Sequence, residues 1–443
     1  MKIVFFSTNS YTFDAASLDI RTFPTRKVQW ERLAEKYPEH DFVLATMLPG
    51  TFLVDSFAPA GAQGRVSIVL LQQGTAECIA AQITGLHPDL AVAASFWVAP
   101  YDWLALRDAS VAEILRVSGI RTVCQDSGTA LTCFDKFRTN QMLSRLGFPV
   151  PRAVFVHHAL FWSERGRESV QVNVYKEYVL QEIRKLRLPL VIKDTVGLSS
   201  YGMEVVSSYG EARAFLCSKK NNSDRIVEEY ISGLQFGAEI HCSGDCCTVL
   251  PPFLFSVNKY GITSPKQSVK IGPVRGEAFR LPELNAMLSR LAKEMHFGAV
   301  AQVDLVFSGE TWYIIEINPR LSGMTETYAA AQGRSLPELL AANALASGGC
   351  PPMSCVCNLK LPILPVERLE ELAALPFVHF VQQIHNKAAR QERERGYGEV
   401  IFGCTRTGGE LLAQLDEIAR RFPDAMEAVF LQNARELAAL LQD

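Results

Sequence analysis

Short apolar runs alternate with amphipathic stretches over the first 125 residues. The apolar runs predict strands at residues 3–6, 42–45, 66–71, 90–94 and 122–124. The stretches between them predict helices at residues 28–37, 74–85 and 111–118. Strands that alternate with helices favour a parallel sheet covered by helices, with the loops at the carboxyl ends of the strands facing a ligand. The sequence therefore indicates the α/β fold class.

A different pattern near residue 300 predicts a β-hairpin. Its strands are expected at residues 301–307 and 312–317, joined by a short turn. Antiparallel pairing about that turn places Asp304 nearly opposite Glu316, and the period of two places Asn318 on the same face as Glu316. The buried face of the second strand is expected to consist of Tyr313, Ile315 and Ile317.

The paired acids of this hairpin point to a metal site. Like charges directly opposite one another destabilise a sheet by up to about 1 kcal/mol, so a cation between Asp304 and Glu316 is favoured. Two carboxylates and the Asn318 carbonyl form an all-oxygen donor set, which suits a hard ion such as Mg²⁺. The alternative is a polar strand face that is turned to solvent.

Three segments upstream carry further candidate groups. Lys136 opens a predicted helix, which would also suit an ordinary surface lysine. Lys193 ends a strand and precedes a loop whose Ser199, Ser200 and Gly202 could turn donors toward a phosphate, although a plain hairpin explains the loop equally well. Residues 226–233, IVEEYISG, form a strand and a hinge that offer backbone N–H and C=O groups beside apolar side chains.

The string EINPRLSG at residues 316–323, with an acid on a strand twelve residues before it, resembles the metal-binding end of the ATP-grasp superfamily. The upstream segments occur in the order of that family, and the resemblance covers roughly residues 126–345. It implies that Asp304, Glu316 and Asn318 bridge two Mg²⁺ ions, with Mn²⁺ as an alternative, to the phosphates of ATP. It also implies that Arg320 assists phosphoryl transfer.

The resemblance extends to the nucleotide contacts. The residues expected to bind ATP are Lys136, Lys193, Ser199, Ser200, Gly202, Glu228, Glu229, Tyr230, Ile231 and Gln235. Glu228 would meet the exocyclic amine of adenine, and the backbone of Glu229 and Ile231 would meet the ring. Gln235 stands where the family commonly has an acid for the ribose hydroxyls, and Glu239 is the alternative. Arg275 is expected to join Arg320 as a catalytic group, because its stretch faces the phosphates and the acceptor in this fold.

The implied architecture is an N-terminal parallel-sheet domain, a central two-lobed ATP-grasp unit (α+β) and a small C-terminal α/β segment. We expect domain boundaries at 1–125, 126–350 and 351–443. The implied reaction joins a small-molecule carboxylate to an amine through an acyl phosphate, with release of ADP and phosphate. A bicarbonate-activating enzyme is the first alternative, although no Met-Lys-Met biotin-carrier motif or duplicated synthetase half is present. A nucleotide-binding module without turnover is the second alternative, although the metal ligands and Arg320 are retained.

Composition narrows the class of partner. The chain has 443 residues, of which 48% are hydrophobic and 21% charged, with a formal net charge of -3. This charge gives no reason to expect nucleic acid or a membrane surface as a partner, and no apolar run reaches the ~18 residues of a membrane span. We expect a cytoplasmic protein, and the protein could form a homodimer.

The odd count of eleven cysteines, in apolar context at Cys78, Cys124, Cys133 and Cys217, predicts buried, reduced thiols.

Overall fold

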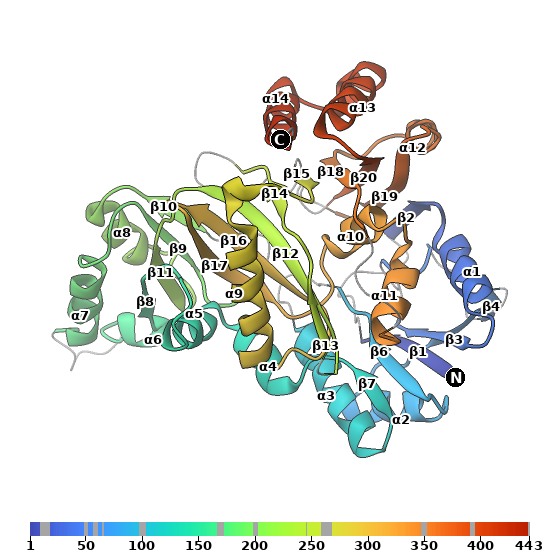
Figure 1. The fold of residues 1–443 in the computed structure, drawn as a ribbon. Coiled ribbons are helices and arrows are strands. Elements are labelled where there is room, and N and C mark those ends of the chain that lie inside the picture. The colour runs from blue at the N-terminus through green and yellow to red at the C-terminus, as the bar shows by residue number, and fades with distance from the viewer. Residues whose placement is uncertain are drawn as a thin grey trace.

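The computed structural model contains three β-sheets with helices packed around them (Figure 1). It describes residues 1–8, 18–47, 52–55, 61–63, 66–96, 103–165, 172–197, 203–244, 246–257, 268–346, 352–389 and 395–441. Among these residues, none of the helices combines the length and the apolar character that a membrane crossing requires.

The first sheet has six strands in the order β4-β5-β3-β1-β6-β7. Its strands are β1 (Lys2–Ser7), β3 (Asp41–Thr46), β4 (Gly61–Gln63), β5 (Val66–Leu70), β6 (Leu90–Ala93) and β7 (Arg121–Val123). All neighbouring pairs are parallel except β4 with β5. Three of its helices are α1 (Arg26–Lys36), α2 (Ala76–Thr84) and α3 (Leu104–Val117). The predicted parallel sheet and its α/β class are therefore confirmed.

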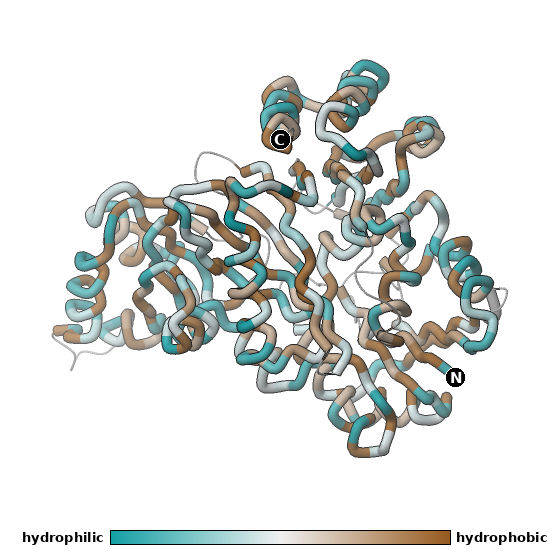
Figure 2. Tube along the Cα trace, in the orientation of Figure 1, coloured by the Kyte–Doolittle hydropathy of each residue, from teal (hydrophilic) through white to brown (hydrophobic). Residues whose placement is uncertain are grey.

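Both faces of this first sheet are buried. On β1, Ile3 and Phe5 belong to one hydrophobic cluster, whereas Val4 and Phe6 belong to another on the opposite face. Apolar side chains on both faces are what a parallel sheet covered by helices requires. The strands of this sheet accordingly stand out as hydrophobic in Figure 2, between more hydrophilic helices.

The second sheet is antiparallel, with four strands in the order β10-β9-β11-β8. Its strands are β8 (Ala153–Val156), β9 (Leu190–Asp194), β10 (Glu204–Val206) and β11 (Arg225–Glu229). The helices of this part are α6 (His158–Phe161), α7 (Val174–Ile183) and α8 (Tyr209–Leu216). In Figure 1 this unit lies at the left of the molecule. It carries two of the predicted segments, the strand that ends near Lys193 and the hinge after β11.

The third sheet has ten strands, nine of them in the order β17-β16-β12-β14-β15-β18-β20-β19-β2, with β13 pairing with β12 beside this path. Its strands are β2 (Leu18–Phe23), β12 (Leu234–Ser243), β13 (Cys246–Val249), β14 (Phe253–Phe255), β15 (Val269–Gly272), β16 (Ala301–Ser308), β17 (Thr311–Asn318), β18 (Cys355–Leu361), β19 (Val378–Asn386) and β20 (Gly396–Thr405). The remaining α-helices are α4 (Ser127–Phe134), α5 (Lys136–Arg145), α9 (Leu281–Glu294), α10 (Thr325–Ala331), α11 (Leu336–Ala344), α12 (Val366–Ala373), α13 (Gly408–Arg421) and α14 (Ala428–Ala439). Short 3₁₀ turns occur at Glu277–Phe279 and Pro423–Ala425.

The two faces of the third sheet differ in character. One face contributes Ile240, Ile271, Leu359 and Phe402, among others, to a large apolar core that also contains residues of α9, α12, α13 and α14. The opposite face is mixed: it carries Asp304, Lys270 and Lys360, and also a second apolar cluster in which Phe253, Val356, Phe380 and Ile401 pack with residues of α10. This face, which we call the polar face, runs from the predicted hairpin at one edge toward the C-terminal strands.

The tenth strand comes from the beginning of the chain. Strand β2 pairs antiparallel with β19, with Ile20 opposite Ile384, so it leaves the first sheet and extends the third. The sequence LDIRTF did not suggest a strand here, because its partner is distant: Thr22 and Gln382, which lie opposite each other, are 360 residues apart. The division of the chain into three domains at 125 and 350 stays a prediction, and the second of these boundaries lies outside the described residues.

The cysteine prediction is partly wrong. Cys242 and Cys247 lie opposite each other on β12 and β13 and form a disulfide, whereas reduced thiols were expected throughout. Cys78 and Cys217 have exposed side chains, although Cys124 and Cys133 are buried as predicted. The pairing was missed because adjacent antiparallel strands, which bring two cysteines close together, create a proximity that spacing along the chain does not display.

Candidate active site

The β16–β17 hairpin brings the predicted metal-binding residues together. Asp304 lies directly opposite Glu316, and Gln302 lies opposite Asn318. The Gln302 side chain links the two ends of the set. Its Nε2 donates to Asp304 Oδ1 at 2.6 Å, and its Oε1 accepts from Asn318 Nδ2 at 2.8 Å. Gln302 was not among the sequence candidates, although its position two residues before Asp304 on the same strand face would have indicated it.

The buried face of β17 differs from the prediction. The core receives Trp312, Ile314 and Ile317, whereas Tyr313 and Ile315 are only partly buried. The register shifts between Asp304 and Leu305, whose partners are Glu316 and Ile314, so that Ile315 is left over. Such a β-bulge reverses the alternation of side chains beyond it. Strict alternation therefore assigned Tyr313 and Ile315 to the wrong face.

Two cations contact the oxygens of this set. Lys136, the first residue of α5, places its Nζ 2.9 Å from Glu316 Oε1 and donates to the Gly197 carbonyl at 2.8 Å. Arg320 Nη2 donates to Asn318 Oδ1 at 3.2 Å, and its Nη1 donates to the Leu321 carbonyl at 3.0 Å. A small cleft lies beside the hairpin, lined by Lys136, Gly197, Glu316 and Asn318 with apolar side chains from α3 and α4.

The second predicted lysine lies deeper. Lys193 is buried on β9, and its Nζ is 2.8 Å from the Glu228 carboxylate on β11. The exocyclic-amine role of Glu228 stays a prediction, since this carboxylate is already paired with a lysine. The Glu229 N–H donates to the Arg152 carbonyl and the Tyr230 N–H to the Pro189 carbonyl, and Ile231 follows in the hinge after β11. These backbone bonds hold the hinge segment against the rest of the second sheet.

Charges in the site shift the pKa values of its members in opposite directions. Burial and the nearby Glu316 raise the pKa of Asp304 to about 7, although Gln302, Lys270 and Arg320 act against the rise. Burial also tends to raise the pKa of Glu316, but Lys136, Lys193 and Arg320 outweigh it, and the net pKa is lowered. One carboxylate of the pair is thus held ionised, and the other is poised to lose its proton when a further cation arrives.

Burial alone would lower the pKa of Lys193. The negative charges of Glu228, Glu316 and Asp304 outweigh it, and the net pKa of Lys193 is raised. The lysine therefore stays protonated and can act as a fixed positive charge toward phosphate oxygens.

The donor set fits the ion that the family resemblance implies. Among the described residues, no group of three or more His, Cys, Asp or Glu side chains is arranged to hold a metal. Mg²⁺ does not require such a group, because it commonly uses one or two carboxylates together with substrate phosphates. Asp304, Glu316 and Asn318 would supply those protein oxygens, and burial together with the charge of Glu316, which raise the pKa of Asp304, would be offset by a bound cation.

The remaining predicted residues fall elsewhere. Ser199, Ser200 and Gly202 lie outside the described residues. Gln235 is partly buried on β12, opposite Val306. Arg275 is exposed after β15 and donates to the Met353 carbonyl, and it is not among the charges that act on Asp304 or Glu316. A role for these residues stays a prediction.

Lys270 lies where Arg275 was expected. Its charge acts on Asp304, and its Nζ donates to the Gly323 carbonyl at 3.0 Å. The alternation of side chains between the two faces of β15 would have identified Lys270 as a residue of the opposite face, because its neighbours Val269 and Ile271 belong to the apolar core.

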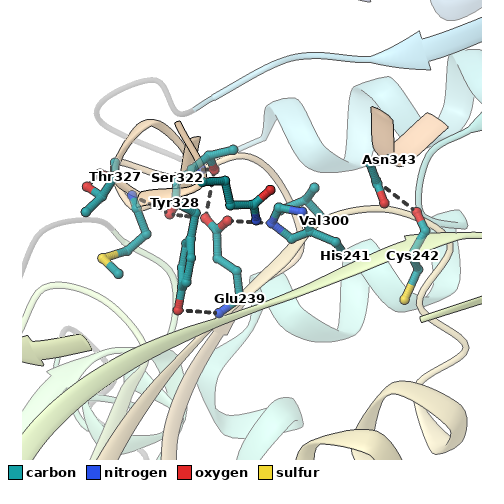
Figure 3. Close-up of polar contacts among 12 residues, drawn as sticks. Glu239, His241, Cys242, Val300, Ser322, Thr327, Tyr328 and Asn343 are labelled. Atoms are coloured by element: carbon teal, nitrogen blue, oxygen red, sulfur yellow. Dashed lines mark hydrogen bonds and ion pairs between the residues drawn. The ribbon is translucent and has the colours of Figure 1, made fainter. Parts of the chain in front are cut away.

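Glu239, the alternative ribose residue, has a different place in the structure. Its side chain is completely buried, and a contact to ribose stays a prediction. Figure 3 shows the polar contacts around this side chain. Both Ser322 and Thr325 donate their hydroxyls to Oε1, at 2.9 and 2.7 Å, and His241 Nε2 lies 2.8 Å from Oε2. Ser322 and Thr325 belong to the segment that follows Arg320. Glu239 therefore anchors that segment to the polar face of the third sheet.

The raised pKa of Asp304 gives a prediction for stability. The folded protein binds this proton more tightly than the unfolded chain, so ionisation of Asp304 costs stability that accumulates between about pH 4 and pH 7. We expect Asp304→Asn in metal-free buffer to raise the Tm at pH 8 by about 2–4 °C, the shift that 1 kcal/mol produces in a domain of roughly 200 residues. The gain should shrink at pH 5. Thermal unfolding at both pH values tests it, with the exposed Asp424→Asn as control, and a lower Tm for Asp304→Asn at pH 8 would contradict it.

Sequence comparison connects this site to known proteins. A family model for the ATP-grasp domain matches residues 133–324. The D-alanine–D-alanine ligase of Coprothermobacter proteolyticus is 26% identical over 226 residues, which cover 49% of this chain and 69% of the relative. The arginine-specific carbamoyl phosphate synthase large chain of Halalkalibacterium halodurans is 26% identical over 166 residues, which are 37% of this chain and only 15% of that one.

Solved structures share the fold over nearly the whole chain. The L-amino acid ligase from Bacillus licheniformis has a TM-score of 0.64 at 16% identity, with 96% of this chain and 97% of that chain covered. N5-carboxyaminoimidazole ribonucleotide synthetase from Thermus thermophilus has a TM-score of 0.63 at 13% identity, with 95% and 98% covered. A biotin carboxylase domain from Hydrogenobacter thermophilus, solved with MgADP, ADP and bicarbonate, has a TM-score of 0.60 at 11% identity, with 95% and 89% covered.

The matched segment contains Lys136, Lys193, Asp304, Glu316 and Arg320, and the solved structures share the fold in which these residues lie. Residues 133–324 of this chain therefore match the ATP-grasp domain family, and they contain the hairpin and the two lysines of the candidate site.

Proposed function

We propose that this protein is an ATP-dependent ligase that joins a carboxylate to an amine and releases ADP and phosphate. The observation that carries the proposal is the convergence of Lys136, Lys193 and Arg320 on the partly buried pair of Asp304 and Glu316. Phosphoryl transfer demands little covalent chemistry from a protein and depends on positive charge placed around the transferring group. The site supplies that arrangement.

The reaction would proceed in two steps. A carboxylate oxygen of the acid substrate bonds to the γ-phosphorus of ATP while the bond to ADP breaks, which yields an acyl phosphate. The amine nitrogen then attacks the acyl carbon, loses a proton and expels phosphate. Arg320 would stabilise negative charge on the transferring group, and Lys136 and Lys193 would hold the phosphates of the nucleotide. Mg²⁺ held by Asp304, Glu316 and Asn318 would supply further neutralisation of phosphate charge.

Hydroxylamine provides the decisive test. This small nucleophile should replace the natural amine and trap the acyl phosphate as a hydroxamate, with ADP formed alongside. We expect a hydroxamate with at least one acid from a panel of amino acids and small carboxylic acids. We also expect Arg320→Ala to lower its formation on the order of 100- to 1,000-fold, the usual cost of losing a donor to developing charge.

The same assay separates the alternatives. ADP release that depends on bicarbonate and not on any other acid would replace the proposal with a bicarbonate-activating enzyme. No ADP with any acid would indicate a nucleotide-binding module. Abundant hydroxamate from both wild type and Arg320→Ala would remove Arg320 from the mechanism.

A second prediction concerns the hairpin carboxylate. Glu316→Gln should remain folded but lose activity on the order of 100-fold, because a neutral amide neither binds a divalent cation well nor pairs with Lys136. Initial rates of ADP formation at saturating Mg²⁺ measure the loss. Glu310→Gln in the exposed turn of the same hairpin is the matched control and should keep wild-type activity. Near-normal rates for Glu316→Gln would rule out its role.

A third prediction concerns the anchor beneath Arg320. Glu239→Gln keeps the shape of the side chain but weakens the hydrogen bonds from Ser322 and Thr325, which hold the segment that follows Arg320. Charged hydrogen bonds of this kind contribute about 1.5–3 kcal/mol, so we expect kcat to fall about tenfold or more. The Kd for MgATP should change little, since Arg320 would act on the transferring group. The exposed Glu283→Gln on α9 serves as control. An equal loss of MgATP affinity would indicate general damage to the fold instead.

A further inference from the structure

A second group of charged side chains lies on the same face of the third sheet as Asp304 and extends from the ATP-grasp segment to the strands that follow it. Lys270 on β15 is opposite Asn358 on β18, and Lys360, two residues further along β18, is opposite Glu399 on β20. Their sequence neighbours point to the apolar core on the other face, namely Val269, Ile271, Cys357, Leu359, Leu361 and Val400. The alternation of the strands thus fixes two lysines and one carboxylate on the same face as Asp304.

The two lysines differ in their contacts. Lys270 Nζ donates to the Gly323 carbonyl at 3.0 Å. Lys360 Nζ lies 4.3 Å from the centre of the Tyr397 ring, and within the described part of the chain no hydrogen bond or ion pair involves this ammonium group. Glu399 acts on Lys360 through its charge, but its Oε1 accepts a hydrogen bond from Asn358 Nδ2 at 2.7 Å and no ion pair joins the two among the described residues. Lys360 is therefore a positive charge without a contacting anion among the described residues.

The surroundings of the lysines make an anion favourable. Both side chains are only partly accessible to solvent. Burial and the charge of Lys270 together lower the pKa of Lys360 to about 8, against the opposing effect of Glu399. Burial likewise lowers the pKa of Lys270, against the opposing charges of Glu399, Glu239 and Asp304. Two cations that are poorly hydrated and close together are stabilised by an anion that contacts both.

The position of the pair relates it to the candidate phosphoryl-transfer centre. The charge of Lys270 acts to lower the pKa of Asp304. Its Nζ also contacts the carbonyl of Gly323, three residues after Arg320. Lys360 is diagonal to Lys270 across neighbouring strands, a separation of about 7–8 Å between Cα atoms. The lysines therefore extend from the edge of that centre toward the C-terminal strands. A substrate that reacts near Arg320 would place its remote end along this line.

We propose that Lys270 and Lys360 form a subsite for an anionic group of the amine substrate. The inference rests on the proposed ligase function and deepens it: the second substrate carries, besides its reacting amine, a carboxylate or a phosphate that Lys360 binds. The amine is thereby directed toward the acyl phosphate. Charge-assisted hydrogen bonds in a partly buried site distinguish such a substrate from a neutral amine by about 10-fold or more.

The test uses the full-length protein and the acid that gives the most hydroxamate. Coupling rates are measured with glycine, L-alanine and other free amino acids, with their carboxamides, and with aminomethylphosphonate. Wild type should prefer an amine that carries an anion over the matched carboxamide by about 10-fold or more in kcat/KM. Preference for an amino acid identifies a carboxylate as the bound group, and preference for aminomethylphosphonate identifies a phosphate-like group.

Lys360→Met then isolates the subsite, because the variant retains the apolar stem and removes the charge. Its kcat/KM for the anionic amine should fall about 10-fold or more, whereas its rate with hydroxylamine, which carries no anion, should stay at the wild-type value. The unchanged hydroxylamine rate also shows that the variant is folded. Lys360→Arg should retain most of the preference, and the exposed Lys293→Met on α9 should behave as wild type.

The outcomes separate this inference from the function on which it rests. If wild type forms hydroxamate but uses carboxamides as well as amino acids and phosphonates, the subsite is wrong and the ligase function stands. Equal losses with hydroxylamine and with the anionic amine in Lys360→Met also overturn the subsite. If wild type forms no hydroxamate with any acid, the ligase function fails and the subsite fails with it.

Discussion

Two partly buried carboxylates face each other across the β16–β17 hairpin, and their partial loss of hydration costs free energy that nearby cations offset. Glu316 is paired with Lys136, and Asn318 with Arg320, at distances of 2.9 and 3.2 Å. Asp304 accepts a hydrogen bond from the neutral amide of Gln302, and its pKa stays raised at about 7. The cations therefore compensate the charge of Asp304 only in part, and the hairpin still attracts a further cation.

This constraint also joins separate parts of the fold. Lys136 begins α5, contacts Glu316 on the hairpin and donates to Gly197 beyond β9, so one side chain links the four-stranded and ten-stranded sheets. Lys193 approaches the same carboxylates from β9. The site therefore depends on the relative position of the two sheets, which is the arrangement that nucleotide enclosure between two lobes requires.

The polar face of the third sheet extends the same chemistry beyond the matched domain. Glu239 accepts a hydrogen bond from Ser322 in the segment after Arg320 (Figure 3). Lys270 contacts the same segment at the Gly323 carbonyl. Lys360 and Glu399 continue the row of charges on strands that follow the domain in sequence. One continuous sheet thereby carries both the proposed phosphate end of the site and the surface that we assign to the second substrate.

The sequence by itself determined much of the local structure. Apolar runs located five strands of the first sheet, and the turn near residue 310 fixed the pairing of Asp304 with Glu316, because hairpin register follows from local geometry. The order of Lys136, Lys193 and the EINPR string identified the family, since each motif is contiguous in the chain. Even there the bulge at Ile315 escaped detection, because nothing in a regular apolar pattern marks one extra residue.

Only the tertiary structure decided which distant residues meet. Glu239 is 83 residues from Ser322, Lys270 is 53 from Gly323, and β2 is separated from β19 by most of the chain. Arg275 was chosen over Lys270 as a catalytic candidate, because the two residues are close together in the sequence. Only the sheet face on which each side chain lies distinguishes them. The disulfide between Cys242 and Cys247 spans only five residues, but it too required the pairing of β12 with β13. Sequence patterns record local periodicity, whereas these contacts depend on how strands are ordered within a sheet, which is settled when the whole core packs.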